Sequence, residues 1–350
     1  MKKSILIILS QMAFLIMNCL GQNKEQSTFY LSNYTFSKME NEIGQVKLNP
    51  DIETEIESIT IEGENARLFK IDKNHKLSIL KSKTPSNTKW LDVIVKAKTS
   101  KGELTDTFRI VMDEFIRNKV IAHRGAWKNT GVPENSIAAL QHAIAMGCEG
   151  SEFDVHMSAD AVPYINHDPE IQNVSIAKSM SDDLTKIKLT NGESLPTLES
   201  YLKAGIQQNK TKLILEIKAS ELGKESSIAL SHQVVDLVEK LKAQAWVDYI
   251  SFDYDVCKEV MKMAPYANVA YLNGDKTPTE LAQDNFFGLD YHYGVLQKNP
   301  DWIKEAKQKN LTINIWTVND QSLMETFLKQ DVDFITTNEP EMLLKLVEDK

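Results

Sequence analysis

The stretch "KVIAHRGAWKNTGVPENS", from Lys119 to Ser136, decides how the larger part of the chain is interpreted. A short apolar run ends in His123, Arg124 and Gly125, and a second turn at Pro133 leads into a helical pattern. Buried strands seldom end in an imidazole and a guanidinium without a chemical reason, because functional groups gather in the loops that a rigid scaffold positions. We predict a strand, a polar loop and then a helix with Asn135 or Ser136 as its N-cap.

The same pattern of an apolar strand followed by a helix repeats to the end of the chain. Short apolar segments alternate with amphipathic helical stretches, which predicts parallel strands joined by helical crossovers. The candidate strands are "KVIAH" (119–123), "SEFDV" (151–155), "KLILEI" (212–217), "DYISFD" (248–253), "NVAYL" (268–272), "GLDYH" (288–292), "TINIWTV" (312–318) and "DFITT" (333–337). Eight strands over residues 119–350 match the size of an α/β protein of the (β/α)8 TIM-barrel class. A doubly wound sheet is the alternative, but no glycine-rich phosphate loop follows the first strand.

Residues 27–115 have a different pattern, in which apolar residues recur at every second position. In "WLDVIVKAKT" (90–99) the side chains of Leu91, Val93, Val95 and Ala97 share one face, and Gly102 closes a turn before "ELTDTFRIVMDE". This pattern predicts a hairpin of a small N-terminal all-β sandwich. The segment resembles a cadherin-like repeat without the acidic calcium-linker sequences. It is either a spacer or packing module, or a module that binds a carbohydrate or another partner.

The first residues indicate export. Lys2 and Lys3 precede an apolar run from Ile5 to Met17, which is typical of a secretory signal peptide over residues 1–21 and short for a membrane span. Cys19 leaves open a lipoprotein alternative, in which its acylated thiol would be the contact with the membrane. We therefore expect a periplasmic or cell-surface protein, with Cys148 and Cys257 as buried thiols outside any disulfide framework.

The balance of charge excludes one class of partner. Lys and Arg number 40 against 49 Asp and Glu, for a net charge of -9. Proteins that bind a phosphate backbone carry a basic footprint, so we expect no nucleic-acid partner.

Polar residues recur where the predicted strands end. Because the carboxyl ends of barrel strands meet at one mouth, these residues should share one pocket. They are His123 and Arg124, Glu152 and Asp154, Glu216 and Lys218, Asp253, and Trp316.

The carboxylates at the strand ends predict a metal site. Side chains alternate along a strand, so Glu152 and Asp154 face the same way, as do Glu216 and Lys218. Carboxylates confined together raise each other's pKa unless a cation neutralises them. An all-oxygen site of three carboxylates without a nearby cysteine suits Mg²⁺ or Ca²⁺ better than Zn²⁺.

A second histidine, His167, follows the short apolar segment "VPYI". Two histidines beside three carboxylates, Arg124 and Lys218 combine an acid/base pair, a metal and an anion-binding site. This constellation is the one expected for cleavage of a phosphoryl ester.

At this point a family resemblance becomes specific. The segments "IAHRGAWKNTGVPENSIAAL", "CEGSEFDVHMSADAVPYINHD", "LPTLESYL", "LILEIK", "WTVN" and "DFITTNEPE" follow one another in the order found in glycerophosphodiester phosphodiesterases, over roughly residues 119–347. The resemblance implies a metal-dependent barrel hydrolase that converts small-molecule glycerophosphodiesters to glycerol 3-phosphate and an alcohol through a cyclic phosphate.

The resemblance also assigns roles to individual residues. His123 and His167 match the two catalytic histidines, and Glu152, Asp154 and Glu216 match the metal carboxylates. Arg124 and Lys218 match the residues that hold the phosphate, and Trp316 matches an aromatic residue at the edge of the substrate. The family's usual Asp-Gly turn is Asp160-Ala161 here, and Asn166 stands where an apolar residue is more usual.

Two other functions remain open from the sequence. One is a phospholipase D-like lyase that acts on lysolipids and stops at the cyclic phosphate. The other is a surface binding protein without catalysis, although binding alone needs no acid/base pair.

Overall fold

The computed structural model describes residues 29–348 apart from residues 38 and 86. The predicted signal peptide and Cys19 lie outside these residues. Within the described residues no helix is both long enough and apolar enough to cross a membrane.

The N-terminal part is a β-domain of two four-stranded sheets. One sheet has the order β1-β3-β6-β5 and the other the order β2-β8-β7-β4. Its elements are β1 (Phe29–Leu31), β2 (Thr35–Phe36), β3 (Glu42–Leu48), β4 (Ile56–Glu62), η1 (Ala66–Leu68), β5 (Phe69–Ile71), β6 (Lys76–Ile79), η2 (Lys81–Lys83), β7 (Trp90–Thr99) and β8 (Gly102–Met112).

The predicted hairpin of this domain is confirmed. Strands β7 and β8 pair antiparallel from Trp90 opposite Val111 to Thr99 opposite Gly102. The alternating side chains of β7 from Leu91 to Ala97 are buried, as a sheet with one face on a core requires.

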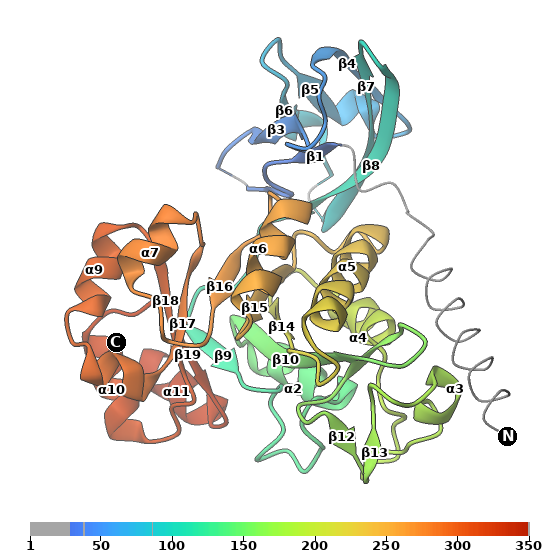
Figure 1. Ribbon diagram of the computed structural model, residues 1–350. Helices are drawn as coiled ribbons and strands as arrows, with labels where there is room; N and C mark the ends of the chain where they lie inside the picture. Colours follow the sequence, from blue (N-terminus) through green and yellow to red (C-terminus); the bar gives the residue numbers. More distant parts are fainter. Residues whose placement is uncertain (1–28, 38, 86, 349–350) are drawn as a thin grey trace, which may run out of the picture.

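The second part is a closed barrel of eight parallel strands, which confirms the predicted α/β fold (Figure 1). The strands, in their order around the barrel, are β9 (Val120–Ala122), β10 (Gly150–Met157), β14 (Lys212–Ile217), β15 (Val247–Ser251), β16 (Val269–Tyr271), β17 (Gly288–His292), β18 (Thr312–Trp316) and β19 (Phe334–Thr337). Closure comes from β9, which pairs with β19 on one side and with β10 on the other.

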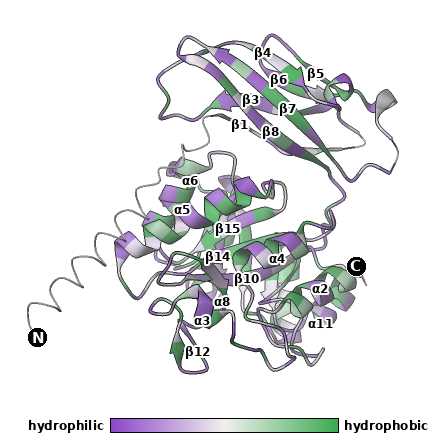
Figure 2. Ribbon diagram, turned by 90° about the vertical axis from the view of Figure 1, so that its right-hand side faces the viewer, coloured by the Kyte–Doolittle hydropathy of each residue, from purple (hydrophilic) through white to green (hydrophobic). Residues whose placement is uncertain are grey.

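Amphipathic helices surround the barrel. Figure 2 shows hydrophilic and hydrophobic residues alternating along α5, as expected for a helix with one face on a sheet and the other in water. The helices are α2 (Ile137–Met146), α3 (Ser181–Leu184), α4 (Leu198–Gly205), α5 (Lys224–Lys240), α6 (Tyr254–Met263), α7 (Pro278–Gln283), α8 (Tyr293–Lys298), α9 (Trp302–Gln308), α10 (Gln321–Lys329) and α11 (Pro340–Glu348).

A small lobe interrupts the alternation after β10. Strand β11 (Pro163–Ile165) runs antiparallel to β10, and the hairpin of β12 (Glu170–Ile171) and β13 (Val174–Ser175) follows. The lobe has an apolar cluster of its own, built around Tyr164, Ile176, Leu184 and Leu195. It lies at the carboxyl ends of the barrel strands, where the predicted site residues are.

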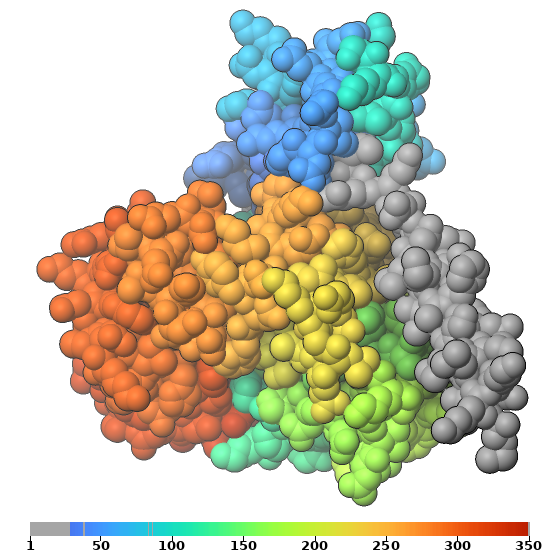
Figure 3. All heavy atoms as spheres, in the orientation of Figure 1, coloured from blue at the N-terminus to red at the C-terminus, as the bar shows by residue number. Residues whose placement is uncertain are grey.

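The β-domain lies at the other end of the barrel (Figures 1 and 3). A cavity of about 330 Å³ lies between the two parts and is lined by Tyr34 of the β-domain and by Lys212, Val247 and Thr312 at the starts of barrel strands. The amino ends of the strands therefore face the β-domain, and the carboxyl ends are left for the site.

Candidate active site

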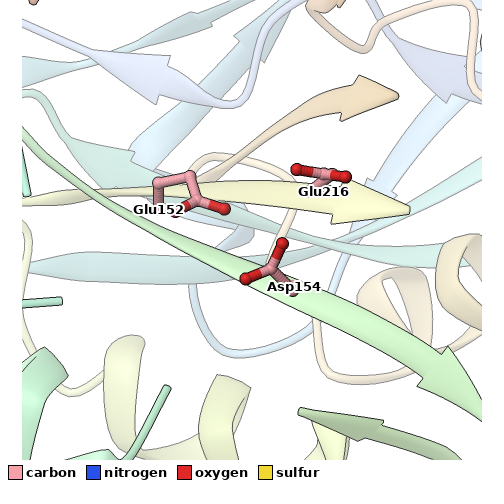
Figure 4. A group of neighbouring side chains, drawn as sticks. All are labelled: Glu152, Asp154 and Glu216. Carbon is pink, nitrogen blue, oxygen red and sulfur yellow. The ribbon is translucent and has the colours of Figure 1, made fainter. Parts of the chain in front are cut away.

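The carboxylates predicted as metal ligands come together at the carboxyl ends of β10 and β14. Strand pairing puts Asp154 directly opposite Glu216, and Glu152 lies two residues earlier on the same face of β10. Figure 4 shows the three side chains converging from the two strands. One oxygen from each of Glu152, Asp154 and Glu216 lies within 4.8 Å of the others, and all three residues are buried.

The electrostatics of this carboxylate group fit a divalent cation. Burial, followed by the charges of Asp154 and Glu216, raises the pKa of Glu152 well above its usual value. Burial and Asp154 raise the pKa of Glu216 to about 8. Oε1 of Glu152 has no hydrogen-bond partner among the described residues. Buried carboxylates in this state require either protons or a cation, and an all-oxygen donor set suits Mg²⁺ or Ca²⁺.

Lys218 links two members of the group. Its Nζ atom lies 3.1 Å from Oδ1 of Asp154 and 2.8 Å from Oε1 of Glu216. Burial raises the pKa of Asp154 in isolation, but Lys218 and other neighbouring groups outweigh burial and hold that pKa below its usual value. Lys218 is thus held at the carboxylates, where it can contact an anionic ligand.

Arg124 reaches the same group from the end of β9. Its backbone N–H donates to Oε2 of Glu152 at 2.8 Å, and its guanidinium donates to Glu134 at 2.9 Å. The buried Nε has no hydrogen-bond partner among the described residues and lies 3.8 Å from Oδ2 of Asp154. A guanidinium with an unused donor beside a pocket is suited to oxygen atoms of phosphate.

The two histidines have different surroundings. Nδ1 of His123 lies 2.8 Å from Oδ1 of Asn338, so this nitrogen donates and Nε2 faces the site, 4.0 Å from Glu152. Burial, with the nearby charge of Arg124, lowers the pKa of His123 to about 4. His167 follows β11 and is more exposed, and its Nδ1 lies 2.7 Å from the carboxylate of Asp168.

An apolar wall completes the site. Trp316 ends β18, and its Nε1 donates to the carbonyl oxygen of Asp290 at 2.9 Å. Its ring makes edge contacts with Phe252 and His292, at centroid distances of 5.5 and 5.3 Å. Leu272 lies in the same wall.

These residues surround one pocket of about 110 Å³. Its lining includes seven of the eight predicted site residues, namely His123, Arg124, Glu152, His167, Glu216, Lys218 and Trp316. Asp154, the eighth, lies beneath them in the carboxylate group. The larger cavity at the β-domain has none of the eight in its lining. Asp253 is the N-cap of α6 and bonds to backbone N–H groups there, so it acts as a cap.

Sequence reasoning missed several supporting residues. It weighed Asn135 only as a helix cap, but Ser136 caps α2, and Asn135 instead donates to Oδ2 of Asp154 at 2.8 Å. Asn338, the partner of His123, was not singled out, although it lies within the matching segment "DFITTNEPE". Glu134 accepts from the guanidinium of Arg124 at the site and so helps to orient it.

Comparisons with known proteins agree with this geometry. The sequence model of the "Glycerophosphoryl diester phosphodiesterase family" matches residues 123–342. A "Glycerophosphodiester phosphodiesterase" of Caldanaerobacter subterraneus is 27% identical over 248 residues, which cover 66% of this chain and 98% of the relative.

Solved structures extend the likeness to the fold. A glycerophosphodiester phosphodiesterase from Parabacteroides distasonis is 45% identical, with a TM-score of 0.65, and the match covers 66% of this chain and 97% of that one. A phosphodiesterase from Oleispira antarctica, solved in complex with the product sn-glycerol-3-phosphate, is 25% identical with a TM-score of 0.55, over 66% of this chain and 97% of that one.

Proposed function

The chain belongs to the glycerophosphoryl diester phosphodiesterase family, and from this premise we propose that it hydrolyses glycerophosphodiesters to glycerol 3-phosphate and an alcohol with a divalent cation at Glu152, Asp154 and Glu216. The observation that carries the proposal is the buried carboxylate group flanked by two histidines in one pocket. The relative from Oleispira antarctica, whose structure holds sn-glycerol-3-phosphate, supports the same product here.

The residues of the site have different roles in binding the substrate. Arg124 and Lys218 bind phosphate oxygens and orient the diester. When bound, a divalent cation supplies positive charge that stabilises the phosphoryl group and makes the glycerol 2-hydroxyl more acidic. Trp316 and Phe252 pack against the non-phosphate part of the substrate, because their rings are apolar parts of the pocket lining and contact each other.

The hydrogen-bond partners of the histidines suggest their roles. His123 donates from Nδ1 to a neutral amide, so its Nε2 is free to take the proton of the 2-hydroxyl. Nδ1 of His167 is paired with the carboxylate of Asp168, which leaves Nε2 as the ring atom that can give a proton to the departing alcohol. The hydroxyl oxygen forms a bond to phosphorus, and the bond from phosphorus to the alcohol oxygen breaks as His167 gives that oxygen a proton. Water then opens the cyclic phosphate.

We further propose that the protein is exported. The pattern of residues 1–21 supports this proposal, with lipid attachment at Cys19 as the variant form. Within this proposal the cadherin-like β-domain serves as a spacer between an anchor and the barrel.

A test on purified protein examines the activity and the metal together. We expect glycerol 3-phosphate from glycerophosphocholine, glycerophosphoethanolamine or glycerophosphoglycerol in the presence of Ca²⁺ or Mg²⁺, and loss of that product after chelation.

Glu216→Gln keeps the shape of the side chain and removes a ligand charge. Metal affinity, measured by calorimetry, should therefore fall, while circular dichroism should show that the fold persists. Full activity in chelated protein or in Glu216→Gln would contradict the proposed metal site. A ³¹P NMR spectrum that ends at a cyclic phosphate would identify a lyase instead.

A further inference from the structure

His156 is a buried histidine that the proposed reaction leaves without a role. It lies on β10 two residues after Asp154, and by strand alternation its side chain is on the same face as Glu152 and Asp154. The residue is only 8% exposed. Its Nε2 lies 3.0 Å from the backbone carbonyl oxygen of His167. The ring therefore contacts the segment that carries a proposed catalytic group.

The chemistry of this contact sets its direction. A carbonyl oxygen can only accept a hydrogen bond. Nε2 of His156 therefore carries a proton and donates a hydrogen bond to the carbonyl oxygen of His167. The ring of His156 is not part of the pocket lining. A buried donor that faces a carbonyl and is shielded from the pocket acts through another residue and has no contact with substrate.

The same strand holds this segment at a second point. The backbone N–H of Asn166 donates to the carbonyl oxygen of Asp154 at 3.1 Å. The two bonds restrain the peptide unit that precedes Asn166 and the peptide unit that follows His167, so the short segment of these two residues is held to β10 at both of its ends. They therefore set the direction in which the His167 side chain leaves the backbone.

Side-chain contacts of His167 provide less restraint than these backbone bonds. The recorded partner of its ring is Asp168, whose side chain is 74% exposed. A solvated carboxylate can move with the imidazole, so it restrains the position of the ring weakly. Asn166 contributes in a different way, since its side chain donates to the carbonyl oxygen of Asp168 at 2.7 Å and closes the turn after His167. The buried anchor next to His167 is thus His156.

We infer that His156 is a positioning residue that holds His167 at the distance proton transfer requires, by a hydrogen bond from its Nε2 to the His167 backbone. This inference rests on the proposed function, in which His167 is the general acid. Misplacement of a reacting group by about 1 Å can lower turnover about 100-fold. A large effect on turnover can therefore arise from a residue that never contacts the substrate.

A matched pair of variants distinguishes the effect of losing the hydrogen-bond donor from the effect of changing the volume of the side chain. Met and Gln have similar length, but only Gln has an N–H donor. With a glycerophosphodiester as substrate, we expect His156→Met to lower kcat by about 10- to 100-fold with little change in KM. His156→Gln should recover most of that loss. His156→Phe is a second variant without a donor, for use if His156→Met does not accumulate as folded protein.

The leaving group provides a readout that general damage to the fold does not change. The nitrophenolate group of a nitrophenyl phosphodiester departs with little need for a proton. The loss of kcat in His156→Met should therefore shrink to less than about 3-fold with this substrate. In the His167→Ala background, His156→Met should cause no further loss of kcat, because the group that it positions is absent.

Tyr164→Phe is the matched control for a lost buried hydrogen bond. Tyr164 lies on β11, and its hydroxyl donates to the carbonyl oxygen of Ser181 at 3.0 Å. Tyr164 pairs with His156 across the two strands, but its hydroxyl bonds to the backbone of Ser181 and not to that of His167, so the variant should keep the wild-type kcat.

Several results would overturn the inference. One is wild-type turnover in His156→Met and His156→Phe. Another is an equal loss of kcat in His156→Gln and His156→Met. A third is that His156→Met lowers kcat as much in the His167→Ala background as it does in the wild-type protein. Failure of the proposed function has a different signature. If His167→Ala alone kept wild-type turnover, the acid role of His167 would be wrong whatever the His156 variants did.

Discussion

Ala161 has a backbone conformation that usually belongs to glycine. Its φ angle is 62°, in the left-handed region, where a β-carbon costs about 1 to 2 kcal/mol. The N–H of Ala161 donates to the carbonyl oxygen of Ser158, and the N–H of Ser158 donates to that of Val162, so the turn closes tightly between β10 and β11. Ala161 in place of the family's usual glycine therefore strains the backbone of this turn locally, but His167 still lines the pocket.

This strain predicts that Ala161→Gly stabilises the protein. We expect a gain of about 0.5 to 1 kcal/mol in the free energy of unfolding, after the greater flexibility of unfolded glycine is subtracted. Chemical denaturation measures the effect. Ala159→Gly is the control, because Ala159 is exposed two residues earlier and has no positive φ angle, and it should destabilise slightly. Equal losses in the two variants would show that the turn stores no strain.

At the scale of elements, strands β17, β18 and β19 place a polar network inside the barrel. Nδ2 of Asn314 donates to Oδ2 of Asp290 and to Oγ1 of Thr336, both at 2.9 Å. Oδ1 of Asp290 has no hydrogen-bond partner among the described residues. Burial raises the pKa of Asp290 to about 7. Asp290 lines both the site pocket and the cavity on the β-domain side, so this network lies between the two ends of the barrel.

The raised pKa gives a pH dependence with a definite sign. The folded protein keeps the proton on Asp290 up to about pH 7, whereas the unfolded chain releases it near 3.8. Stability should therefore fall as the pH rises between these values. Asp290→Asn removes this titration and keeps an acceptor for Asn314. Relative to wild type, the variant should be nearly neutral at pH 4 and more stable at pH 8, by at most about 4 kcal/mol.

Thermal unfolding of both proteins across this range measures the difference. The other buried carboxyls titrate in wild type and variant alike, so their contributions cancel. A stability difference that is independent of pH would show that Asp290 is ionised in the folded protein throughout the range.

At the scale of the whole molecule, the β-domain is packed against the barrel through aromatic residues. The ring of Tyr34 lies 5.0 Å from that of Tyr266, and the ring of Trp90 lies 6.2 Å from that of Trp246. Nζ of Lys242 lies 3.1 Å from Asp92. Buried Asn209, in the loop between α4 and β14, donates to the carbonyl oxygen of Met112 at the end of β8 at 2.9 Å. The β-domain therefore covers the amino end of the barrel and leaves the carboxyl end free for substrate.

These contacts predict that the two parts unfold together. Tyr34 is 4% exposed, and Tyr34→Ala should destabilise the protein by about 3 kcal/mol. Because the contact is shared, the temperature at which catalytic activity is lost should fall, while kcat below that temperature stays unchanged. Tyr34→Phe keeps the ring and loses only the hydroxyl that accepts from the Leu31 N–H, so its loss of stability should be smaller, about 1 kcal/mol. If Tyr34→Ala loses activity at the wild-type temperature, the stability of the barrel is independent of the β-domain.

The barrel and most of the pocket could be predicted from the sequence. The alternation of apolar strands with amphipathic helices marks all eight barrel strands, because that periodicity is a property of each segment alone. Strand alternation also places Glu152 and Asp154 on one face, and the rule that strand ends converge brings His123 and Lys218 to them.

The residues that support the pocket, and the place where the β-domain packs, depend on contacts between distant parts of the chain. Asn338 reaches His123 across 215 positions of sequence, and Asn135 reaches Asp154 across 19. His156 reaches the backbone of His167 through the antiparallel return of β11. Such contacts depend on the register of neighbouring strands and on barrel closure. The pattern within one segment determines which face a side chain takes, but the partner that it meets is set by elements packed against it from elsewhere in the chain.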